Sequence, residues 1–500
     1  MSPWEGILTG FSTIMQLEPF FFCFLGVLIG TLVGVLPGLG PTGACALLLP
    51  LTFGRDATTA LVMLCGIYYG AMYGGSTTSI LVNVPGEAAS VVTCIDGHQM
   101  ALKGRAGPAL SISGIGSCIA GTMGIFFLML VAPPLARAAL KFGPPEYFAI
   151  SLLGLLVLSR LTGKSPIKSY TMVFAGIALA TVGIDPISGH LRFVGSFKKL
   201  LEGIDFMPVI MGLYGIGEVL ASVREIGVTR ELKKFRLRDL IPTRVDMKES
   251  IVPIFRGGII GFLIGLLPGP ATIISTFVSY GVERKLSKRP EEFGKGAIAG
   301  VAGPESANNG ATGGALVPLL SLGIPFSPMP AILLAAFMIH GVLPGPTLIK
   351  NHPTVFWGII ASMYIGNIML LILNLPLVSI FARVALIPSR ILMPIVIVFC
   401  FLGAFAVRNS IFDLYIMIIF GIIGYLFRLE DYDPSPLVLG IIIGPVLENS
   451  LRQSIVIFRG DYFKFFMRPL SGIIITIAIL VFLAPLIKIL FSRKSRKRLP

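Results

Sequence analysis

Glycines and small polar residues gather directly after two breaks in the apolar part of the chain. The first break is GVLPGLGPT at residues 34–42, and the second is GLLPGPAT at residues 265–272. A helix that starts at such a break directs unpaired N–H groups and the positive end of its dipole into the adjoining space, which suits a carboxylate or phosphate. The carbonyl groups freed on the other side of the break suit a small cation such as sodium. The two breaks therefore predict a site for an anion and a cation.

A polar stretch follows each break, at residues 70–87 and 302–314. Asn308 and Asn309 offer amide donors and carbonyl acceptors, so they can hold both an anion and a cation. Adjacent amides in apolar sequence need partners, and the surrounding proline and glycines predict a backbone that does not stay fully helical. Glu305 is interpreted either as a proton or sodium ligand or as a helix cap. Asn83 is the expected contact in the first stretch, with Glu87 at an interface.

The predicted substrate- or ion-binding residues form two sets, one in each half of the chain. The first set is Gly38, Gly40, Pro41, Thr42, Gly74, Gly75, Ser76, Thr77, Ser79, Asn83 and Pro85. The second set is Pro268, Gly269, Thr272, Glu305, Asn308, Asn309, Gly313, Gly314 and Pro325. The alternative interpretation is that the glycines mediate close helix packing and the hydroxyls bond to backbone carbonyls. No cofactor is expected apart from a coupling ion, sodium or a proton, whose ligands the sequence does not assign.

The elements that position these residues are membrane helices. The chain is 54% hydrophobic and 13% charged, whereas soluble domains carry about 25% charged residues. We therefore expect an all-α integral membrane protein with roughly 10–13 transmembrane helices plus re-entrant hairpins. Because a broken helix in hydrocarbon leaves backbone groups unpaired, each break must line a cavity. A matched pair of interrupted segments is typical of a transporter's binding site.

Net charge and cysteine content exclude other classes. The net charge of +15 comes from basic residues in short loops and in the C-terminal tail, which are typical of cytoplasmic anchors and not of a nucleic-acid surface. The six cysteines form no CxxC pair, so we infer neither disulfides nor a metal site.

Internal similarity predicts a duplication. Residues 1–222 and 251–500 form the two predicted transmembrane repeats, joined by a basic cytoplasmic linker at 223–250. Three residues of the first repeat match three of the second at one common offset. Gly70, Gly74 and Pro85 correspond to Gly310, Gly314 and Pro325, respectively. No Lys or Arg precedes Arg55, whereas basic loops flank the second break. This charge bias favours inverted repeats, an external N-terminus and a cytoplasmic C-terminus, with a parallel repeat as the alternative.

Isolated charged residues elsewhere receive structural interpretations. Asp185 is expected in a loop, His340 in a hydrogen-bonded structural role, and Arg408 paired with Asp413 on one helical face. An intramembrane enzyme would need a nucleophile and a base, and neither a catalytic triad, a P-loop nor an HExxH motif occurs. A passive channel would need a continuous polar lining. A secondary transporter, and no enzyme, is the favoured interpretation.

The motifs resemble those of the large membrane subunit of the tripartite tricarboxylate transporter family. They are GVLPGLGPT at 34–42, YGAMYGGSTTSIL at 69–81, PESANN at 304–309 and GGA at 313–315. The resemblance implies a bacterial inner-membrane carrier that works with a small four-helix membrane subunit and a periplasmic solute-binding protein. It also implies uptake of citrate or another organic carboxylate, driven by an ion gradient that is commonly sodium. Ser306, Gly310 and Thr312 stand where the family typically has alanine, which leaves the substrate open.

Overall fold

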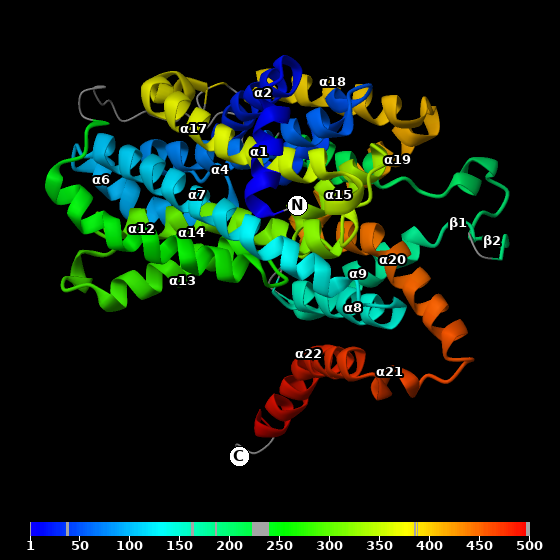
Figure 1. Cartoon of the computed structure of the whole chain (residues 1–500). Helices are drawn as coiled ribbons and strands as arrows, with labels where there is room; N and C mark the ends of the chain where they lie inside the picture. The colour runs from blue at the N-terminus through cyan, green and yellow to red at the C-terminus, as the bar shows by residue number, and fades with distance from the viewer. Residues whose placement is uncertain are drawn as a thin grey trace.

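The computed structural model describes residues 2–36, 40–161, 165–185, 188–222, 240–384, 387 and 389–496. Within these ranges helices dominate, and the expected all-α membrane class is confirmed. The described strands are β1 (Gly183–Ile184) and β2 (Leu191–Arg192), which pair antiparallel. Figure 1 shows their hairpin projecting from one end of the helical body, with α21 and α22 reaching away from it at another side.

The described helices follow one another along both halves. In the first half they are α1 (Pro3–Ile14), α2 (Leu17–Val35), α3 (Gly40–Leu48), α4 (Ala57–Val82), α5 (Val91–Thr93), α6 (Gln99–Leu102), α7 (Ala106–Ala139), α8 (Pro144–Leu161), α9 (Pro166–Ala180), α10 (Phe206–Ile210) and α11 (Gly217–Ser222). In the second half they are α12 (Arg244–Gly265), α13 (Ala271–Leu286), α14 (Ala299–Leu322), α15 (Pro328–Ile339), α16 (Leu348–Asn351), α17 (Pro353–Val384), α18 (Ser389–Arg408), α19 (Ile411–Leu429), α20 (Ser435–Ile457), α21 (Lys464–Met467) and α22 (Pro469–Arg496).

The ends of the long helices follow from local sequence. Asp56 begins α4, because its carboxylate accepts hydrogen bonds from the backbone N–H groups of Thr58 and Thr59. Asn83 ends α4 in the left-handed conformation, with φ 58°. Gly323 ends α14 in the same conformation, with φ 74°. The two caps are related by the same offset that aligns the polar stretches.

Glycine-mediated contacts join α2 to α4 and α12 to α14. A Cβ atom on Gly30 would lie 2.5 Å from the carbonyl oxygen of Ile67, and one on Gly261 would lie 2.1 Å from that of Ala307. The same close approach recurs one turn before and after, at Gly26, Gly34, Gly257 and Gly265. Backbones touch at these contacts because glycine has no side chain. The equal spacing in both halves supports the predicted duplication, whereas its inverted orientation stays a prediction.

Two helix hairpins, α2–α4 and α12–α14, form the centre of these contacts, and each is covered by a helix from the other half. The long helix α7 of the first half packs against α12 and α14, and α17 of the second half packs against α2 and α4. The same exchange recurs further along the chain, where α9 packs against α20 and α19 packs against residues 206–222. In Figure 1, α7 runs beside α12 and α14. The two sequence halves therefore interlock and do not lie apart as separate bodies.

The expectation that the backbone around Asn308 and Asn309 leaves the helical conformation is wrong. Helix α14 runs without interruption through 24 residues, including Pro304 and Pro318. Its residues from Gly300 to Leu322 are all buried, so neighbouring helices enclose the sites where proline removes a hydrogen bond. Such proline residues are tolerated in membrane helices when neighbours satisfy the freed backbone groups.

Four described helices are long and apolar enough to cross a membrane, by length and composition. They are Leu17–Val35, Ala106–Ala139, Pro353–Val378 and Ile411–Leu429. Shorter apolar helices accompany them, such as Pro328–Ile339. The predicted number of full spans stays a prediction.

The glycine contacts predict a position-specific stability effect. Gly261→Ala should lower the melting temperature of the purified protein, because the new methyl group meets a backbone carbonyl that cannot move aside; overpacking of this kind costs about 1–3 kcal/mol. Gly281→Ala in α13 is the matched control, since nothing lies within 4 Å of its added Cβ. Equal melting temperatures for the two variants, measured in detergent, would contradict this packing.

Candidate functional site

A central cavity of about 390 Å³ lies between the two breaks. Residues 40–43, at the end of the first break, and residues 270–273, at the end of the second, both line it. The other described lining residues are Tyr68, Met72, Pro85, Gly86, Glu87, Ala88, Tyr214, Ala315, Ser327, Pro328, Met329, Arg428, Asp433 and Ser435. Segments far apart in the chain thus meet at one site, as the matched breaks predict.

Two helices begin at this cavity. Helix α3 starts at Gly40 and helix α13 at Ala271, each near the end of its break. The first turn of a helix leaves backbone N–H groups without intrahelical partners, and its dipole favours negative charge there. Thr42 and Thr272 add a hydroxyl to each first turn. The cavity can therefore accept an anion from two directions.

Arg428 of α19 adds a full positive charge to the cavity wall. It is the single Lys or Arg among the described lining residues. Its guanidinium pairs with the carboxylate of Glu218 in α11. Arg428 is not among the predicted site residues, because an arginine at the end of an apolar segment is typical of a membrane anchor. The signal available was the polar run RLEDYDPS at 428–435, which also supplies Asp433 and Ser435 to the lining.

Glu87 also lines the cavity, a position that was not predicted for it. Its side chain is buried and accepts a hydrogen bond of 2.7 Å from Nδ2 of Asn308. Gly75 leaves room for this side chain, because a Cβ atom there would lie 2.7 Å from Cγ of Glu87. The Oδ1 atom of Asn308 has no hydrogen-bond partner among the described residues. Asn308 thus does not line the cavity itself but holds a residue that does, Glu87.

Glu305 lies behind the cavity, and its interpretation as a helix cap is wrong. It occupies the second turn of α14 and is 1% exposed. Its Oε2 accepts a hydrogen bond of 2.5 Å from Ser76, and its Oε1 accepts one from Thr93. Among the described residues no Lys or Arg forms an ion pair with Glu305 or Glu87. Two buried carboxylates without a cationic partner therefore stand near the cavity.

Several predicted site residues lie at helix contacts instead. A Cβ atom on Gly74 would lie 2.4 Å from the carbonyl oxygen of Thr31, and one on Gly314 would lie 2.3 Å from that of Phe262. Gly313 lies against Gly124 in the same way. For these positions the geometry agrees with the packing interpretation. The Ser79 hydroxyl, similarly, donates to the carbonyl oxygen of Gly75.

The remaining predicted residues lie around the breaks or on neighbouring helices. Asn309 donates to Ser117 of α7 and does not line the cavity. Gly269 has φ 141°, which favours glycine, and its N–H donates to the carbonyl oxygen of Phe326. Pro268, Pro325 and Asn83 do not line the cavity either, and Asn83 is exposed. Thr77 faces a smaller cavity, and Gly38 lies outside the described residues.

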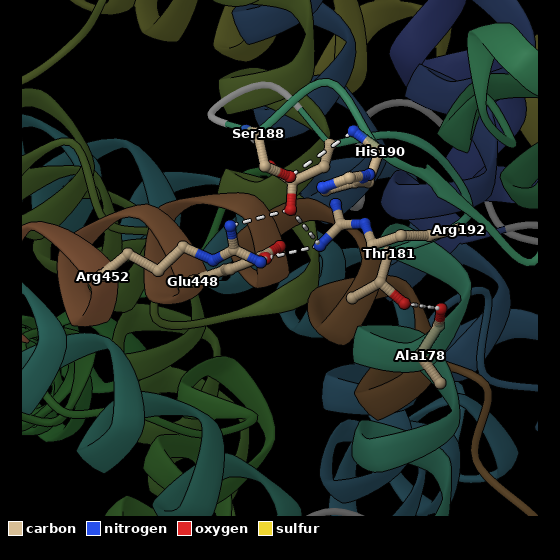
Figure 2. Close-up of polar contacts among 8 residues, drawn as sticks. Ala178, Thr181, Ser188, His190, Arg192, Glu448 and Arg452 are labelled. Carbon is tan, nitrogen blue, oxygen red and sulfur yellow. Dashed lines mark hydrogen bonds and ion pairs between the residues drawn. The ribbon is translucent and has the colours of Figure 1, made fainter.

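A second charged cluster fixes the β1–β2 hairpin. Arg452 of α20 contacts Asp185 at 2.8 Å and Glu448 at 2.7 Å, and Arg192 contacts Glu448 at 2.6 Å. Figure 2 shows Arg192 of the hairpin and Arg452 of α20 meeting at Glu448. Asp185 is thus in a loop, as expected, and ties that loop to α20. The cluster's charges balance, which fits a structural role.

Polar contacts are also present at His340 and at Arg408. His340 lies 2.9 Å from the Thr52 hydroxyl. The Arg408 guanidinium pairs with Asp413 at 3.2 Å, but the expectation that they share one helical face is wrong, because Arg408 ends α18 and Asp413 lies in the first turn of α19.

Comparison with known proteins gives a family. Two proteins of Agrobacterium vitis are similar to this chain. One, described as an uncharacterized 52.8 kDa protein in the TAR-I ttuC' 3'region, is 45% identical over 487 residues, which is 97% of each chain. The other, an uncharacterized protein in the TAR-II ttuC' 3'region, is 43% identical over 236 residues, which is 47% of this chain and 98% of that protein. No solved structure matches. The tripartite tricarboxylate transporter TctA family model matches residues 20–439, so the chain belongs to this family and the resemblance is confirmed.

Proposed function

We propose that this protein is the permease subunit of a tripartite secondary transporter that imports a tricarboxylate or related organic carboxylate. The observation that carries the proposal is the central cavity, where two helix N-termini and Arg428 surround one space of about 390 Å³. This volume lies within the range of small-molecule sites, which is about 300–1,000 Å³. The role is transport and not catalysis.

The polar groups of the cavity suit a carboxylate. Arginine binds carboxylates through two parallel N–H donors, and Arg428 already holds the carboxylate of Glu218. An incoming substrate carboxylate would take the place of Glu218 on this guanidinium. A second carboxylate of the same molecule would lie at the N-terminus of α3 or α13. A molecule with several carboxylates therefore fits better than one with a single charge.

The charges of the cavity also support coupling to a cation. Its described lining includes one basic residue, Arg428, and two acidic ones, Glu87 and Asp433. A substrate carboxylate adds further negative charge in a place of low dielectric constant, where uncompensated charge is expensive. A cation that enters with the substrate offsets this charge. We propose sodium as the coupling ion, with a proton as the alternative.

The tripartite family name supports two partners. We propose that a small four-helix membrane subunit and a periplasmic solute-binding protein act with this chain in the bacterial inner membrane. Reconstituting the three proteins in liposomes tests the function, by uptake of a panel of carboxylates with and without a sodium gradient. Saturable, gradient-dependent uptake is expected. Flux that neither saturates nor responds to the gradient would indicate a passive channel instead.

Arg428→Gln should raise the substrate KM about tenfold or more, because a charge-assisted hydrogen bond to a carboxylate is lost. The double variant Arg428→Gln/Glu218→Gln leaves no unpaired carboxylate at Glu218. Its KM should equal that of the single variant Arg428→Gln. Arg55→Gln is the matched control, since Arg55 pairs with Glu18 on the surface, where both side chains are about half exposed. Uptake assays that give an unchanged KM for both Arg428 variants would remove this residue from the site.

Asn308 and Asn309 should respond differently to replacement by leucine. Asn308→Leu removes the donor to Glu87 on the cavity wall, so substrate affinity should fall about tenfold. Asn309→Leu removes a contact with Ser117 away from the cavity, so the melting temperature should fall while KM stays unchanged. Both constants are measured on the same purified preparations. If both variants transport with wild-type substrate and sodium dependence, neither amide serves the site.

The charge bias gives an orientation that labelling can test. We propose an external N-terminus and a cytoplasmic C-terminus, as the positive-inside rule favours. Single cysteines at positions 3 and 495, in a chain without its native cysteines, should react with an impermeant reagent from opposite sides of the membrane. Reaction of both from the same side would contradict this topology.

A further inference from the structure

A second, smaller cavity lies between α4, α7 and α17, apart from the central one. Its volume is about 20 Å³, which is room for one occupant the size of a water molecule. Five of its lining residues carry side-chain oxygen atoms: Tyr73, Ser76 and Thr77 from α4, Ser113 from α7 and Asn374 from α17. None of these helices supplies a positive charge to it. The cavity therefore offers hard oxygen ligands from three helices to a single small guest.

Asn374 is the feature that points to a ligand. Its side chain is 7% exposed, and its Nδ2 donates to the carbonyl oxygen of Leu370. Its Oδ1 atom has no hydrogen-bond partner in the described part of the chain. Buried carbonyl oxygens are rarely left unpaired, so such an atom on a cavity wall indicates a donor or a cation as its partner.

Glu305 supplies the matching negative charge. The Ser76 hydroxyl lies on the cavity wall and donates to Oε2 of Glu305 at 2.5 Å. The donated proton leaves lone pairs of the Ser76 oxygen for another partner. One carboxylate balances one monovalent cation, whereas calcium sites gather several carboxylates. In the described residues no cluster of three His, Cys, Asp or Glu side chains forms a site for a metal ion.

We propose that the cavity bounded by Ser76, Ser113 and Asn374 binds a small monovalent cation, which Glu305 neutralises. The proposal rests on the proposed function, because it gives the coupling ion a site apart from the breaks. Helix α14 links this site to the substrate cavity. It carries both Glu305 and Asn308, and Asn308 donates to Glu87 on the wall of the central cavity. Occupation of the small cavity therefore changes the charge balance behind Glu87.

Sodium binding can be measured without any substrate. The full-length protein in detergent is titrated with radioactive sodium in choline buffer, with no carboxylate present. Saturable binding is expected for the wild type. Asn374→Ala and Ser113→Ala should each raise the Kd for sodium about tenfold, as expected for one lost contact, and Glu305→Gln should abolish binding. Ser111→Ala is the matched control, because this buried hydroxyl of α7 donates to the Leu240 carbonyl and does not line the cavity; its Kd should stay unchanged.

Each outcome bears on one proposal. Unchanged sodium Kd values for folded Asn374→Ala and Ser113→Ala, judged by size-exclusion elution, overturn the cation site. Absence of sodium binding to the wild type also overturns it, and uptake driven by a pH gradient would then assign the coupling role to a proton. Sodium binding that depends on these residues, in a protein that takes up no carboxylate, supports the cation site and counts against the proposed function.

Discussion

Direct contact between helix backbones is the constraint on which this structure depends. Along α2–α4 and α12–α14, carbonyl oxygens occupy the places where side chains would stand, at Gly30 and Gly261 among others. Close approach holds each hairpin as a thin, rigid unit. The breaks lie at the ends of α2 and α12, so this packing also fixes where α3 and α13 begin. The central cavity is thus positioned by glycines that do not line it.

Interlocking of the two halves determines which movements the fold permits. Because α7 covers α12 and α14 while α17 covers α2 and α4, neither half can move as a free body. In the proposed transport cycle, a change in access to the central cavity would therefore involve helices of both halves together. The contacts of Glu87 with Asn308, and of Ser76 with Glu305, cross between α14 and the first half. Movement of α14 relative to the first half would change both of these hydrogen bonds.

Sequence predicted the fold class, both breaks, and five cavity-lining residues, which are Gly40, Pro41, Thr42, Pro85 and Thr272. These signals are local, since proline, glycine and apolar runs act within a few residues of their position. Arg428 and Glu87 were not recognised because their roles depend on partners more than 200 residues away, Glu218 and Asn308. The continuity of α14 was missed for the same reason, since enclosure by neighbouring helices overrides the local effect of proline.

The burial of α14 has a consequence for how the chain enters the membrane. This helix carries Glu305, Asn308 and Asn309 and faces protein on all sides, so it is a poor candidate for insertion into lipid alone. Its packing partners α7, α12 and α13 all precede it in the chain. During synthesis the ribosome delivers α14 to a membrane that already holds its neighbours. The order of the sequence thus lets a polar helix leave the insertion machinery directly into a protein environment.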